Sequence, residues 1–98
     1  MTLEELPGAE LVLSGLHDLQ NGEPHTIGAL LVAIASIRLT SAHLNIPKER
    51  LLPEPELILY DYLQRERDDA YAYYNALLNR LNSFCNALEL IYKDNQIE

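Results

Sequence analysis

The sequence has 98 residues, of which 48% are hydrophobic and 22% are charged, a composition that predicts one folded domain and excludes a disordered chain. Its net charge of −8 disfavours sequence-independent binding to nucleic acid and binding to an anionic membrane, because both need clustered lysine and arginine. We therefore expect a single domain over residues 1–98, no nucleic-acid partner, and, among proteins, a preference for basic partners.

Two features of the sequence concern where the protein acts. The N-terminal segment Met1–Glu5 lacks the basic region of a signal peptide. The longest apolar run, Ile27–Ala35, falls well short of the about 20 residues that cross a bilayer. These observations predict a cytoplasmic protein without a membrane span.

The first predicted helix covers residues 8–20. Pro7 and Gly8 mark its start, and Asn21–Gly22 supplies a stop signal at its end. Between them, apolar residues recur at steps of three and four and form one stripe, as one face of an amphipathic helix requires. The stripe comprises Ala9, Val12, Leu16 and Leu19.

A second helix is predicted from Thr26 to His43, with Thr26 as its N-cap. Every residue of Ile27–Ile37 is apolar except two small ones, Gly28 and Ser36. A helix that is apolar all round is buried all round. We expect the rest of one chain to be too short to cover this segment, so that a second copy of the chain covers it.

The connector at residues 45–55 contains three prolines, which exclude a continuous helix there. Pro47 is expected to open one short turn. Apolar side chains at Ile46, Leu51 and Leu52 would then hold the connector against the core.

The segment from Glu56 to Tyr92 contains neither proline nor glycine and carries an apolar stripe with alternating steps of three and four. We predict one continuous helix, roughly 55 Å long at about 1.5 Å per residue. As an alternative, the chain turns near Glu66, because Gln64–Asp69 contains no apolar residue, and folds back as a four-helix bundle. The stripe keeps its phase across that gap, which favours continuity. It comprises Tyr60, Leu63, Arg67, Ala70, Tyr74, Leu77, Leu81, Phe84, Leu88 and Ile91.

These elements predict an all-α fold, a small helical bundle in which two short helices pack on one long C-terminal amphipathic helix. The predicted function is a small acidic protein-interaction module of regulatory, adaptor or antagonist type, acting as a homodimer. The predicted interface consists of apolar residues from the second helix and from the long stripe: Leu30, Ile34, Ile37, Tyr60, Leu63, Tyr74, Leu77, Leu81, Phe84 and Leu88.

The segment Arg38–His43 supports an alternative function. It resembles the Arg-x4-6-His signature of HEPN domains, which are all-α and often act as metal-independent ribonucleases. The resemblance covers this segment alone. It implies that Arg38 orients a phosphate, that His43 transfers protons, and that a dimer brings two copies together. Apart from this alternative we predict no catalytic residue.

The three histidines give no indication of a metal site. His17, His25 and His43 occur in neither an H-x-x-x-H nor an E-x-x-H arrangement. We therefore expect no metal and no cofactor.

Charged residues cluster midway along the long predicted helix. Asp61 and Arg65, and also Arg65 and Asp69, are spaced for ion pairs on one helix face. This spacing predicts a solvated, salt-bridged surface.

Overall fold

The computed structural model describes residues 3–96, with side chains described through Tyr92. Every regular element within that range is helical, which confirms the all-α prediction. In chain order the elements are η1 (Leu3–Glu5), α1 (Ala9–Gln20), α2 (Ile27–Ile34), α3 (Ser36–Ser41), η2 (Lys48–Arg50), α4 (Pro55–Glu66) and α5 (Ala70–Gln96).

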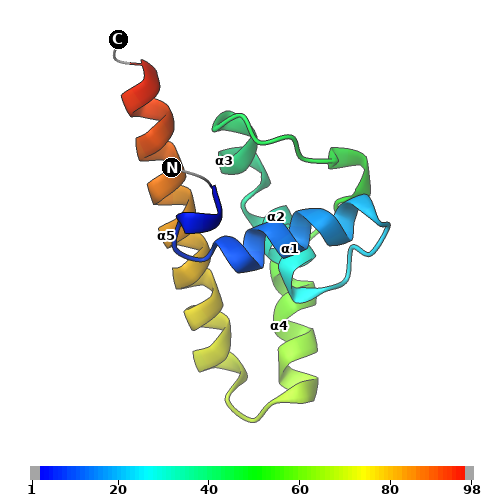
Figure 1. Ribbon diagram of the computed structural model, residues 1–98. Coiled ribbons are helices and arrows are strands. Elements are labelled where there is room, and N and C mark those ends of the chain that lie inside the picture. Colours follow the sequence, from blue (N-terminus) through cyan, green and yellow to red (C-terminus); the bar gives the residue numbers. More distant parts are fainter. Residues whose placement is uncertain (1–2, 97–98) are drawn as a thin grey trace.

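Helix α5 is the long C-terminal helix of the predicted fold, with 27 residues. In Figure 1 it forms one side of the molecule, and α4 runs antiparallel beside its N-terminal half. Helices α1 and α2 cross each other beside the middle of α5, and α3 lies beside its C-terminal half. No helix within the described residues is long and apolar enough to cross a membrane.

Helix α1 has the predicted bounds to within one residue and ends at the predicted stop signal. Gly22 adopts φ 79°, a left-handed conformation that glycine accepts without steric cost. The Gly22 N–H donates to the carbonyl of Leu19, and the Glu23 N–H donates to that of Asp18. These bonds satisfy carbonyls at the helix end and turn the chain into α2.

Helices α1 and α2 cross in direct backbone contact, which two glycines permit. A Cβ atom added to Gly15 would lie 2.1 Å from the carbonyl oxygen of Gly28. A Cβ atom added to Gly28 would lie 2.9 Å from the carbonyl oxygen of Leu11. Any side chain at Gly15 would therefore force the helices apart.

The single helix predicted from Thr26 to His43 is wrong in its length, although its N-cap is confirmed. The Thr26 hydroxyl accepts the Ala29 N–H at 3.1 Å and donates to Asp18 Oδ2 at 2.7 Å. The helix is interrupted at Ala35, and α3 ends before His43. Beyond the interruption, Arg38 of α3 donates to Glu89 of α5, a tertiary contact that local helix preference cannot anticipate.

The expectation that one chain cannot cover Ile27–Ile37 is also wrong. Helices α1 and α4 pack on α2, and Leu30, Leu31 and Val32 are fully buried within the single chain. Ile37 is the exception, because 82% of its surface remains exposed.

The continuous helix predicted from Glu56 to Tyr92 is wrong, and the alternative turn near Glu66 is confirmed. Helix α4 ends at Glu66, Arg67 adopts an extended conformation, and α5 starts at Ala70. The turn places the two apolar faces against each other, so that α4 and α5 share one core. An unbroken helix would leave part of the stripe in water.

The connector follows the prediction. Residues Lys48–Arg50 form the one-turn helix η2 after Pro47. Ile46 is buried, and Leu51 and Leu52 pack against the core.

Candidate functional site

Most of the predicted interface residues lie in the core of one chain. Of the ten, only Ile37 is exposed. Ile34, Tyr60 and Tyr74 are half-buried, and the ring of Tyr60 meets that of Tyr74 edge-on, with centroids 5.3 Å apart. The other six are buried: Leu30, Leu63, Leu77, Leu81, Phe84 and Leu88. These six stabilise the monomer and can meet a second chain only if the helices separate.

The guanidinium of Arg38 donates hydrogen bonds to three residues on one face of α5. Its Nε donates to Glu89 Oε2 at 2.9 Å, and its Nη2 donates to Glu89 Oε1 at 2.9 Å and to Asn86 Oδ1 at 2.8 Å. Its Nη1 donates to Asn82 Oδ1 at 3.3 Å. The three acceptors lie on one helix face because they follow steps of four and three residues. All but one of the guanidinium N–H groups are therefore engaged.

This ion pair shifts the pKa of both partners in the direction that favours the charged forms. The hydrogen bond from Arg38 lowers the pKa of Glu89, and the bond to Glu89 raises the pKa of Arg38. The two side chains remain 38% and 46% exposed, so water and salt screen the attraction.

Cys85 lies beneath this junction, with 1% of its surface exposed. Burial raises the pKa of its thiol, while the positive charge of Arg38 opposes the increase. A protonated, buried thiol is a poor nucleophile, so Cys85 serves as a core residue.

His43 also contacts α5, about one turn beyond Glu89. Its backbone is left-handed, with φ 69°. Its imidazole Nε2 is hydrogen-bonded to the Tyr92 hydroxyl, and the two ring centroids are 4.4 Å apart. Arg38 and His43 thus both attach the α3 segment to α5. A guanidinium so extensively bonded within its own chain has little capacity left for a phosphate, which counts against the ribonuclease alternative.

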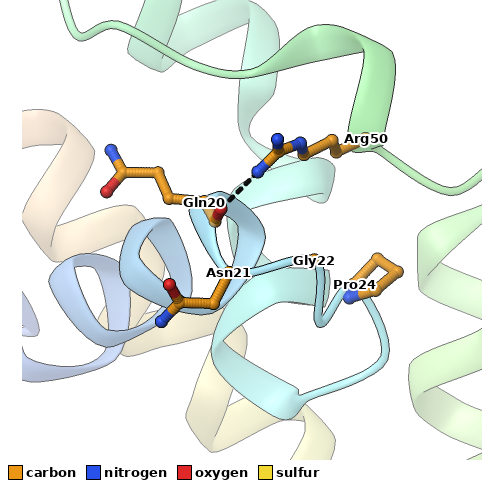
Figure 2. Close-up of a pocket in the computed structure, with 5 residues that line it drawn as sticks. All are labelled: Gln20, Asn21, Gly22, Pro24 and Arg50. Atoms are coloured by element: carbon orange, nitrogen blue, oxygen red, sulfur yellow. Dashed lines mark hydrogen bonds between the residues drawn. The ribbon is translucent and has the colours of Figure 1, made fainter.

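Shallow hollows surround the C-terminal end of α1. One, with a volume of about 370 Å³, is lined by Gln20, Asn21, Gly22, Pro24 and Arg50 (Figure 2). Arg50 donates from Nη1 to the backbone carbonyls of Leu19 and Gln20. This cation interacts favourably with the negative end of the α1 dipole, so its charge stabilises the folded chain.

A second hollow of about 420 Å³ lies next to the first, between the α1–α2 turn and Tyr62 of α4. Glu23 and His25 are among its lining residues. No group of three histidine, cysteine, aspartate or glutamate side chains suited to a metal occurs in the part of the chain that the structure describes.

Among the residues whose side chains the structure describes, five large apolar or aromatic side chains are exposed, and they lie on α3, α4 and α5. Their exposed fractions are 82% for Ile37, 66% for Leu57, 42% for Tyr62, 69% for Tyr71 and 61% for Leu90. The predicted interface included only Ile37 among them. The others lie off the stripe, and an apolar residue at an off-stripe position is the signal that could have identified them.

The predicted ion pairs near the α4–α5 turn are confirmed in part. Arg65 pairs with Asp61. Asp69 pairs with Arg67 instead, at 2.7 Å, because the turn breaks the helical spacing from Arg65. The Arg67 guanidinium also lies 4.0 Å from the centroid of the Tyr73 ring. Its hydrogen bonds lower the pKa of Asp69.

Comparisons with protein-family models, with curated proteins and with solved structures gave no match to this chain. Its function therefore has to be inferred from its own residues.

Proposed function

We propose that the protein is a small acidic interaction module, of regulatory, adaptor or antagonist type, that binds protein partners through exposed apolar side chains and associates with a second copy of itself. The observation that carries this proposal is the exposure of Ile37, Leu57, Tyr62, Tyr71 and Leu90 on α3, α4 and α5. When a partner removes large exposed apolar side chains from water, the free energy of the complex falls.

The composition of the exposed set also supports a protein partner. Tyrosines are enriched at protein interfaces because they add apolar area with little loss of side-chain entropy. The hollows beside α1 are shallow and mix charged with apolar lining residues, which favours surface contact over capture of a small molecule.

The net charge of −8 makes two kinds of partner respond differently to salt. Two copies of this chain repel each other, so salt should strengthen self-association through apolar contacts. A basic partner is attracted by the same charge, so salt should weaken that complex.

Light scattering over a micromolar concentration series, at low and moderate salt, tests the proposal. We expect the mass to rise from 11.1 kDa towards twice that value, and to do so at lower concentration in the higher salt. Ile37→Ser should shift the transition to higher concentration without changing the melting temperature. Asn79→Ser, at an exposed polar position of α5, is the matched control and should change neither. A monomeric mass throughout the series contradicts self-association.

A further inference from the structure

Helix α3 is a short segment with a break at each end. It spans six residues, from Ser36 to Ser41. Ala35 interrupts the helix on its N-terminal side, and His43 adopts a left-handed φ of 69° on its C-terminal side. The Leu44 N–H donates to the carbonyl of Leu39, and the His43 N–H donates to that of Thr40, so the left-handed residue ends the helix in a C-cap. The segment is thus bounded by a helix interruption on one side and by a C-cap on the other.

The bonds that hold α3 on α5 are polar and lie at the surface. They are the contacts of Arg38 with Glu89, Asn82 and Asn86, and the contact of His43 with Tyr92. Bonds between half-exposed groups exchange readily with water, since each partner can be solvated when the bond opens.

The surface beneath these bonds is apolar. Leu39 of α3 is fully buried, and Cys85 and Leu88 of α5 are 1% and 5% exposed. The Thr40 Oγ1 atom is buried as well and has no hydrogen-bond partner among the described residues. The α3 segment therefore carries one buried hydroxyl that is left unsatisfied, a cost that exposure to water would remove.

We infer that α3 is a hinged flap, latched to α5 by Arg38, that opens as a local unit between Ala35 and His43 and exposes the Cys85 face of α5. Local opening of a segment at a free energy below that of global unfolding is common in native proteins. This flap concerns the chain by itself, so it does not depend on the proposed partner binding.

Cys85 reports this opening directly because it is the only cysteine of the chain and is buried when the flap is closed. N-ethylmaleimide, a neutral thiol reagent, should label the native protein slowly. Arg38→Ala should speed labelling about tenfold, the effect of about 1.4 kcal/mol on the opening equilibrium. Since the charge of Arg38 lowers the pKa of the Cys85 thiol, its removal by itself would slow the reaction. Acceleration therefore reports access to the thiol.

A urea series separates local from global opening. Labelling through the flap should depend weakly on urea, because little surface is exposed, whereas labelling through global unfolding follows the full equilibrium slope. Arg80→Ala removes the Arg80–Glu10 ion pair between α5 and α1 and is the matched control, with an unchanged rate expected. Asn86→Ala, a milder surface change, should give a smaller acceleration than Arg38→Ala. Equal rates for Arg38→Ala, Asn86→Ala and the parent, or acceleration that follows the global slope in both variants, would overturn the flap.

Discussion

Single residues decide how closely α1 and α2 approach each other. Gly15 and Gly28 meet backbone to backbone, and nothing in the apolar pattern of the sequence marks Gly15 for this role. Within a helix, glycine is about 1 kcal/mol less favourable than alanine, so its presence at Gly15 is understandable only from the tertiary contact.

We predict that Gly15→Ala destabilises the protein although it improves local helix propensity. The added Cβ would lie 2.1 Å from the Gly28 carbonyl oxygen and 2.3 Å from its carbonyl carbon, both rigid backbone atoms. Overpacking of this kind typically costs about 1–3 kcal/mol, and we expect the upper end of that range. Urea unfolding followed by circular dichroism measures the loss. Ser14→Ala, at an exposed position of the same helix, is the control and should be neutral or slightly stabilising. A stabilised Gly15→Ala variant would show that the helices do not touch.

The ion pair of Arg38 and Glu89 should make stability depend on pH. The pKa of Glu89 is lowered in the folded state by the hydrogen bond from Arg38. Its contribution is therefore fully present above the unfolded value of about 4.3 and is lost as the pH falls through the lower folded value.

Glu89→Gln removes this contribution while keeping the shape of the side chain. At pH 7 and low salt we expect the variant to be less stable than the parent by up to about 1 kcal/mol, since the pair is half-exposed. Well below the folded pKa of Glu89 the two proteins should be equally stable, because the parent carboxyl is then protonated. Urea unfolding of both proteins across that pH range makes the comparison. A difference that stays constant with pH would mean that the pair contributes nothing electrostatic.

At the scale of elements, the sequence predicted those helix ends that carry local signals. The Asn21–Gly22 stop, the Thr26 N-cap and the turn after Pro47 are all observed. The breaks at Ala35 and at Arg67 are different, because neither residue is a helix breaker. The turn near Arg67 was indicated only by the absence of apolar residues from Gln64–Asp69, and no local signal marks Ala35. The apolar pattern of one segment carries no information on the tertiary contacts that the segment will make.

We predict that Leu77→Asp damages the fold far more than Asn79→Asp. Leu77 is 3% exposed in the core of the α4–α5 hairpin, so a carboxylate there would be buried without a partner. We expect a loss of about 3 kcal/mol or more, equivalent to about 12 °C or more in melting temperature for a domain of this size. Asn79 is exposed on the opposite face, where substitutions usually change stability by less than about 0.5 kcal/mol. Thermal unfolding by circular dichroism compares them, and similar melting temperatures would show that the assigned helix faces are wrong.

At the scale of the whole molecule, the sequence identified the residues of the α3–α5 junction only in part. Arg38 and His43 were singled out because of their spacing. Their partners Glu89 and Tyr92 lie about fifty residues away and belong to no recognisable pattern with them. The fold of the whole chain brings these residues together, and it buries six of the ten predicted interface residues in the core.

The distribution of charge over the whole molecule predicts that it does not cleave RNA. Holding a polyanion takes several cationic contacts, and this chain has 7 lysines and arginines against 15 acidic residues. Three of the arginines already bond within the chain. Arg38 donates to Glu89 of α5, Arg50 donates to a carbonyl at the end of α1, and Arg67 donates to Asp69. We expect purified protein, incubated with a mixed RNA pool without metal, to leave the pool intact, as should Arg38→Ala and His43→Ala. Cleavage by the parent that both substitutions abolish would replace the interaction module with the ribonuclease alternative, whereas cleavage by all three proteins would identify a contaminant.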